Sequence, residues 1–168
     1  MVALLRLSLT IAFFLVPTLS YADQSDRLKV LFINPGFSTG FWGSVTETME
    51  AAAVDLEIDL TILHADRDRI KMLDLTEKAL AGDEAWDFAV VVNELQQGPA
   101  LARAVDEAEI DYLFLLNRLS DEQMSEMRAA GELRHYIGSV TPRNFVTGYE
   151  IARALLDAAA PQADGTIR

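Results

Sequence analysis

The chain has 168 residues and no cysteine, which excludes disulfide bonds, thiol catalysis and cysteine metal sites. Its 26 acidic residues outnumber its 14 basic residues and give a formal net charge of −12. This balance argues against nucleic acid or an anionic membrane surface as a partner.

The first 22 residues have the pattern of a secretory signal peptide. Arg6 supplies a positive charge, residues 7–16 form a mostly apolar core, and Ser20-Tyr21-Ala22 is a small-x-small cleavage site. The apolar core is shorter than the roughly 20 residues of a membrane span, so cleavage after Ala22 is favoured over an uncleaved N-terminal anchor. We therefore expect an exported, periplasmic protein, and residues 23–168 have the length of one α/β domain.

The most informative segment is 28–56, LKVLFINPGFSTGFWGSVTETMEAAAVDL. Residues 29–33 form an apolar run with little alternation, which is typical of a strand covered on both faces. A Gly/Pro loop follows, and then a helix that begins near the adjacent aromatic residues Phe41 and Trp42. Either ring alone could be a packing residue, but two adjacent residues cannot both face inward on one helix. At least one ring should lie at the mouth of the sheet.

The alternation of strand and helix continues through the rest of the chain. Further strands are expected at 58–64, 87–93, 110–116 and 135–140, and further helices at 69–80, 98–108, 120–130 and 144–159. Short links between them predict an α/β fold with a doubly wound parallel sheet between two layers of helices. The last helix follows a hinge-like segment, 138–142, and either starts a second lobe or covers the same sheet.

Polar side chains follow the carboxyl ends of the expected strands. They are Asn34, the segment from His64 to Asp66, Asn93 and Glu94, and Asn117 and Arg118. Carboxyl ends of parallel strands share one edge of a sheet, so these side chains should converge beside the two aromatic residues. Amides and carboxylates bind hydroxyl groups and a ring stacks on the apolar face of a sugar, which together suit a small polyhydroxylated ligand. Asn and Asp at strand ends also close turns, and this alternative stays open for each.

The sequence contains no recognisable catalytic or cofactor motif. It has no G-x-S-x-G, no P-loop, no H-E-x-x-H and no G-x-G-x-x-G. His64 and His135 are far apart in the sequence, and no metal site is indicated. We therefore expect a binding protein without a cofactor rather than an enzyme.

Several segments together resemble the type 1 periplasmic substrate-binding proteins of ABC transporters, in the branch of the ribose- and galactose-binding proteins. They are N-P-G-F-S-T-G-F-W, A-A-A-V-D-L-E-I-D-L, V-V-V-N-E, L-L-N-R and I-G-S-V-T-P-R-N-F-V-T-G-Y-E-I-A-R-A-L-L, in this order across residues 28–160. In that family two α/β lobes close on the ligand. The resemblance implies stacking by Phe41 and Trp42. It also implies polar contacts from four residues: Asn93, Asn117, Arg118 and Asp66.

The resemblance also implies a division of the chain. Residues 1–22 would be the signal peptide, residues 23–141 the N-terminal ligand-binding lobe, and residues 142–168 the start of a truncated second lobe. The family commonly has an acidic residue where Arg143 stands at the crossing into the second lobe, so no ligand role is carried over to Arg143.

We expect an exported solute-binding protein that delivers a sugar-like ligand to the membrane permease of an ABC transporter. A periplasmic partner of a membrane sensor kinase or chemoreceptor would use the same site, so this alternative stays open. A small exported hydrolase would need a nucleophile and a base that the sequence does not reveal. A phosphoacceptor receiver domain would need an aspartate where Asn93 stands, and the sugar-responsive repressors carry a DNA-binding module where the signal peptide stands.

Overall fold

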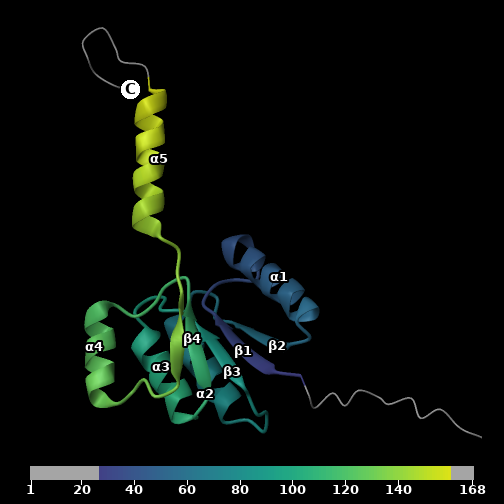
Figure 1. Cartoon of the computed structure of the whole chain (residues 1–168). Helices are drawn as coiled ribbons and strands as arrows, with labels where there is room; N and C mark the ends of the chain where they lie inside the picture. The colour runs from purple at the N-terminus through teal and green to yellow at the C-terminus, as the bar shows by residue number, and fades with distance from the viewer. Residues whose placement is uncertain (1–26, 160–168) are drawn as a thin grey trace, which may run out of the picture.

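The computed structural model describes residues 27–159 (Figure 1). The expected signal peptide, with its cleavage site after Ala22, lies outside these residues. The strands are β1 (Lys29–Asn34), β2 (Asp59–His64), β3 (Phe88–Val91), β4 (Asp111–Leu115) and β5 (Tyr136–Val140). The helices are α1 (Gly40–Asp55), α2 (Arg69–Leu80), α3 (Gly98–Glu107), α4 (Asp121–Ala130) and α5 (Asn144–Ala158). Every element expected from the sequence is present.

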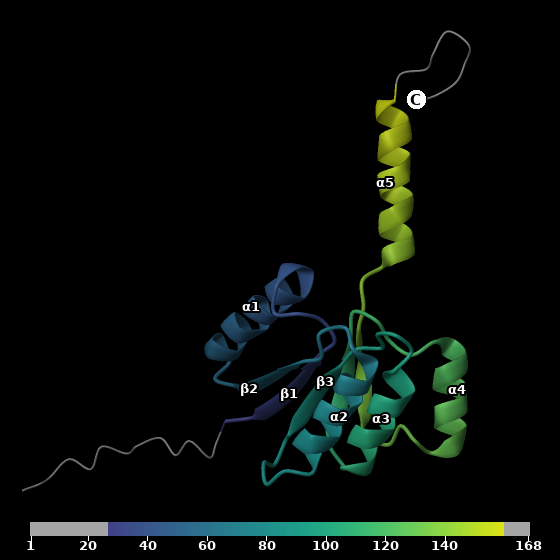
Figure 2. The ribbon, with the colours of Figure 1, turned by 180° about the vertical axis from the view of Figure 1, so that it is seen from behind.

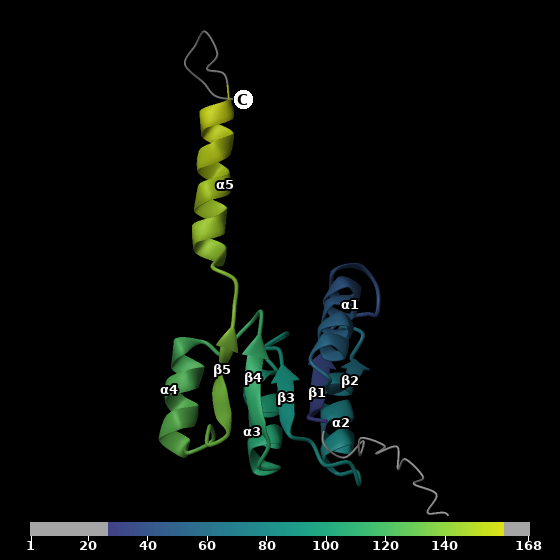
Figure 3. The ribbon, with the colours of Figure 1, turned by 45° about the vertical axis from the view of Figure 1, so that its right-hand side comes forward.

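The five strands form one parallel sheet in the order β2-β1-β3-β4-β5. Figure 3 shows the strand arrows side by side, pointing the same way. Helix α1 lies on one face, and α2 and α3 lie on the other with α4 beside them (Figures 1 and 2). The predicted doubly wound α/β fold is thereby confirmed, and all the carboxyl ends of the strands share one edge.

The sheet separates two cores of unequal size. The larger core contains Leu31 and Ile33 of β1 and side chains from α2, α3 and α4. The smaller core contains Phe32 of β1, Val90 of β3, Val92 just after β3, and Trp42 of α1. Because successive residues of a strand point to opposite faces, β1 is buried on both sides, and this explains its continuous apolar run.

Helix α5 does not cover the sheet. It follows β5 after three residues and extends away from the other elements in all three views (Figures 1, 2 and 3). None of its residues from Asn144 to Ala158 is buried. None of the helices within residues 27–159 is long and apolar enough to cross a membrane.

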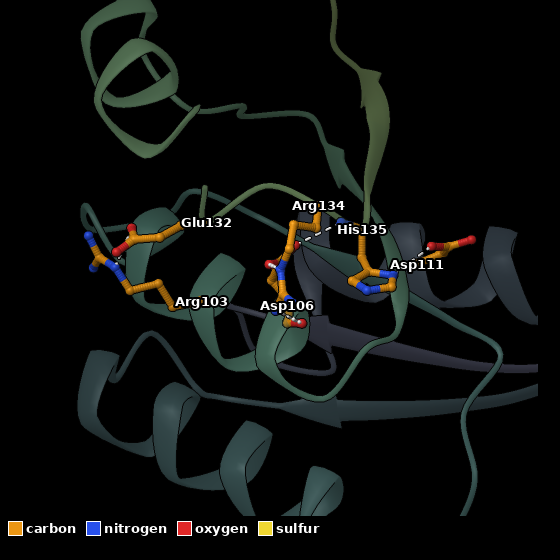
Figure 4. Close-up of polar contacts among 6 residues, drawn as sticks. All are labelled: Arg103, Asp106, Asp111, Glu132, Arg134 and His135. Carbon is orange, nitrogen blue, oxygen red and sulfur yellow. Dashed lines mark hydrogen bonds and ion pairs between the residues drawn. The ribbon is translucent and has the colours of Figure 1, made fainter. Parts of the chain in front are cut away.

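A buried carboxylate fixes the opposite edge of the sheet, where the strands begin (Figure 4). Asp106, near the end of α3, accepts hydrogen bonds from Nε of Arg134 at 3.0 Å and from the backbone N–H of His135 at 2.8 Å. Nη2 of Arg134 also donates to the Asp106 carbonyl at 3.2 Å. These bonds hold the chain just before β5 against α3, and so place the edge strand.

Replacing Asp106 by alanine should therefore destabilise the lobe. Asp106→Ala leaves the partly buried N–H of His135 without its partner and removes the ion pair with Arg134, so we expect a loss of about 2 kcal/mol in the free energy of unfolding. Asp111→Ala is the control, because it removes only a half-exposed pair with His135 and should cost less than about 1 kcal/mol. Urea unfolding measures both variants, and equal losses would contradict the assigned role of Asp106.

The fully buried Tyr112 predicts a pH dependence. Its hydroxyl has no hydrogen-bond partner within residues 27–159, and burial raises its pKa. The unfolded chain releases this proton near pH 10 while the folded chain keeps it, so stability falls as the pH rises above about 10. Tyr112→Phe should remove this alkaline loss and raise the free energy of unfolding at pH 7 by about 1 kcal/mol. Urea unfolding of the wild type and of Tyr112→Phe at pH 7 and at a pH above about 10 tests this. A lower free energy of unfolding for Tyr112→Phe at pH 7 would contradict it.

Candidate functional site

Asn34 builds the loop that leads from β1 into α1. Its side chain is fully buried, and its Oδ1 accepts a hydrogen bond from the backbone N–H of Gly36 at 2.9 Å. Its Nδ2 donates to the carbonyl of Trp42 at 3.2 Å and to Oγ1 of Thr46 at 3.0 Å. The turn-closing alternative therefore applies to Asn34, whose role is to fix the first turn of α1.

The two aromatic residues at the start of α1 have different environments. The Trp42 side chain is only 8% exposed and packs in the smaller core, whereas Phe41 is 64% exposed. Their ring centroids are 5.2 Å apart at an interplanar angle of 77°, an edge-to-face contact. Trp42 thus contacts the ring of Phe41 from the core, and Phe41 is the more exposed of the two, while stacking of both rings on a ligand stays a prediction.

Asn93 has a comparable structural position at the end of β3. Its Oδ1 accepts from the backbone N–H of Gly98 at 2.9 Å, and its Nδ2 donates to the carbonyl of Arg118 at 3.0 Å and to Oε1 of Gln123 at 3.2 Å. These bonds use both donors and join the loop after β3 to the start of α3 and to the loop after β4. Asn93 holds loops in place rather than offering a free amide.

Glu94, the residue after Asn93, joins side chains from three loops. Its Oε1 accepts from Nη2 of Arg67 at 3.2 Å, and its Oε2 lies 3.4 Å from Nδ2 of Asn117. We call Arg67, Glu94 and Asn117 the polar row; they follow β2, β3 and β4 respectively. The polar residues expected at the strand ends include Glu94 and Asn117 but omit Arg67, and the ligand contacts implied by the resemblance include only Asn117 of the three. The available signal for Glu94 was its position directly after the strand, while Arg67 stands among alternating charges that indicate a solvated patch.

Asp66 and Arg118, the other two predicted contacts, lie beside the polar row in exposed pairs. Asp66 pairs with Lys71 of α2, and Nη2 of Arg118 donates to Asp121 of α4 at 2.9 Å. Asp68 caps α2, and hydrogen bonds from the backbone N–H groups of Lys71 and Ile70 hold the pKa of its carboxyl below the ordinary value. Asp66, Asp68 and Arg118 therefore each already have a hydrogen-bond or ion-pair partner.

Unusual backbone conformations gather at the same edge of the sheet. The non-glycine residues with positive φ there are Asp66, Arg67, Leu95, Gln96 and Leu116, with values from 52° to 64°. Such conformations cost free energy and are found most often where a loop shapes a binding site. All five lie in the loops that follow β2, β3 and β4.

An apolar groove of about 300 Å³ lies beside this edge, between α1 and the end of β4. It is lined by Phe41, Ser44, Val45, Thr48, Met49, Leu115 and Leu116. We call it the α1–β4 groove. Within residues 27–159 no group of three or more histidine and carboxylate side chains is arranged to hold a metal ion.

The packing of Trp42 depends on a glycine. A Cβ added to Gly36 would lie 2.0 Å from Cδ1 of Trp42, so Gly36→Ala must displace the indole and with it the support of Phe41. We expect a loss of about 1 to 3 kcal/mol in the free energy of unfolding, as in other overpacked cores. Gly82→Ala is the control, because its nearest atoms would be 3.6 Å away. Urea unfolding compares the two, and an unchanged Gly36→Ala would contradict this account.

Neither a protein-family model nor a curated protein matches the chain. Among solved structures, the chain is similar to a periplasmic sugar-binding protein from Pseudomonas fluorescens, with 30% sequence identity and a TM-score of 0.66. The match covers 80% of this chain and 39% of that one, so the chain spans well under half the length of that protein. The similarity supports the fold of one lobe of a periplasmic binding protein.

Proposed function

We propose that this chain contains the N-terminal ligand-binding lobe of an exported solute-binding protein for a small, polar, sugar-like ligand. The observation that carries the proposal is the convergence of the polar row and the open ring of Phe41 at the edge where the strands end. The similarity to a periplasmic sugar-binding protein supports the same class of ligand.

In this proposal each member of the site has a separate role. Phe41 offers an apolar face to the ligand, and Trp42 fixes its ring from the core. Oxygens of Glu94 accept hydrogen bonds from hydroxyl groups, and Arg67 and Asn117 donate to them. The opposite charges of Arg67 and Glu94 neutralise each other, which suits an uncharged ligand. Asn93 holds the loop after β4 and the start of α3 in place, and Asp66 and Arg118 border the site.

The proposed cellular role follows from export. Residues 1–22 would direct the protein to the periplasm, and residues 23–141 would form the lobe that binds the ligand. Residues 142–168 would begin a second lobe. The ligand would then be delivered to a membrane permease of an ABC transporter, which needs no catalytic group on this chain.

The direct test measures the thermal midpoint of residues 23–168 against a panel of neutral sugars, with amino acids as a second ligand class. A ligand that binds only the folded state should raise the midpoint saturably. Loss of ring contact in Phe41→Ala should weaken binding about tenfold, in line with about 1.4 kcal/mol for a well-placed aromatic contact.

The matched control for Phe41→Ala is Phe145→Ala, which removes an exposed ring from α5, away from the site. Glu94→Gln keeps the shape of the side chain but removes its charge, and it should weaken sugar binding by a similar factor. A cooperatively folded chain that responds to no sugar, or only to amino acids, would reject the proposed ligand class.

A further inference from the structure

Two loops at the edge of the candidate site contain the same strained turn. Residues 65–68 follow β2 and residues 94–97 follow β3, and in each the N–H of the last residue donates to the carbonyl of the first, at 2.9 Å and 3.0 Å. Both central residues of each turn have positive φ, as in a type I′ turn: 53° and 61° in the first, 52° and 64° in the second. Glycine, asparagine and aspartate dominate such turns. Leu95, the first central residue of the second turn, is therefore a bulky residue where glycine is favoured.

Leu95 differs from the other three central residues of these turns. Each of those three has a side-chain partner outside its own turn: the pairs are Asp66 with Lys71, Arg67 with Glu94, and Gln96 with Gln123. Leu95 belongs to neither hydrophobic core within residues 27–159, and it is 46% exposed. The left-handed backbone at Leu95 costs free energy, and packing within the described lobe does not offset that cost.

The turn that carries Leu95 is fixed on both sides. Before it, Oδ1 of Asn93 accepts from the backbone N–H of Gly98 at 2.9 Å, and Nδ2 of Asn93 donates to Gln123 at 3.2 Å. After it, Oε1 of Gln96 accepts from Nε2 of the same Gln123 at 3.2 Å. The leucine is thus presented to solvent on a backbone that is already ordered, so less conformational entropy is lost when it contacts a ligand.

Leu95 lies at the polar row and on a loop that neighbours the loop of Phe41. It directly follows Glu94, whose carboxylate bonds to Arg67. The backbone N–H of Arg67 in turn donates at 2.7 Å to the carbonyl of Pro35, in the loop between β1 and α1. Because β3 pairs with β1 in the sheet, the loops that bear Leu95 and Phe41 share one stretch of the edge.

We propose that Leu95 contacts the ligand and supplies a second apolar surface for it beside Phe41. This inference rests on the proposed function and extends it. Two loops would then hold the apolar C–H surface of a neutral sugar, while Glu94 bonds to its hydroxyl groups. Contact with the sugar buries the leucine, and this burial accounts for a leucine where glycine would relieve the backbone.

The variant Leu95→Gly separates the two effects of this side chain. Glycine relieves the left-handed backbone, so the urea midpoint of residues 23–168 should rise by roughly 0.2 to 0.5 M. Loss of the apolar contact should weaken sugar binding about fivefold. Isothermal titration calorimetry with four neutral sugars, D-glucose, D-galactose, D-ribose and D-xylose, measures the binding.

The matched control is Glu57→Gly. Glu57 has a φ of 54°, is exposed, and lies between α1 and β2 at the opposite edge of the sheet. Its replacement should raise the urea midpoint by a similar amount and leave the affinity for sugar unchanged. Leu95→Met keeps a large apolar side chain and should retain most of the affinity.

The stability readout needs no ligand. A lower urea midpoint for Leu95→Gly would show that the leucine packs in the folded chain, and it would overturn the inference. If a sugar binds and Leu95→Gly binds it as tightly as Glu57→Gly does, the inference is wrong while the proposed sugar site stands. If none of the four sugars binds to the folded chain, the proposed function fails, and the ligand contact of Leu95 fails with it.

Discussion

The edge of the sheet that forms the candidate site depends on one buried amide. Asn34 stands at the end of a strand that is covered on both faces, and it makes three hydrogen bonds to the loop and helix that follow. A buried amide without partners would cost free energy, so the loop conformation and the burial of Asn34 require each other. This conformation seats Trp42 in the smaller core and leaves the ring of Phe41 outside. Asn93 acts in the same way for the loops after β3 and β4.

Most of the fold could be predicted from the sequence because its signals are local. Apolar runs and helical spacing identify the strands and helices, and the Ser120 cap of α4 is visible as a Ser-Asp-Glu start.

The site could be predicted only in part. Position at a strand end identifies which residues lie at the edge, but it does not show which of their polar atoms form hydrogen bonds with neighbouring loops. Asn93 and Glu94 both follow the same strand, for example, and the sequence does not reveal that the Asn93 side chain bonds to the start of α3 and to the loop after β4. The choice between Phe41 and Trp42 likewise depends on the rotation of α1 over the sheet, which Gly36 allows.

The unequal covering of the two faces also follows from connectivity. Three consecutive helices follow β2, β3 and β4 on one side, while α1 alone packs on the other, and α5 leaves the sheet. The sheet therefore has one complete core and one partial core. The larger core, with Tyr112 and Phe114 in contact at 6.1 Å between ring centroids, provides most of the buried apolar area. The partial core borders the polar row, so an apolar surface and a hydrogen-bonding surface lie next to each other at one edge.

Buried asparagines fix the loops, and exposed loop residues form their outer surface. This arrangement affects how the ligand preference of such a lobe can change during evolution. Asn34 and Asn93 hold the loops from beneath, while Phe37, Phe41, Leu95 and Gln96 are exposed above them and contribute little to the core. Substitutions at the upper positions can accumulate during evolution with little loss of stability, because surface changes are usually nearly neutral. A lobe built in this way can acquire a new ligand preference through a few neutral steps, with its sheet and its cores unchanged.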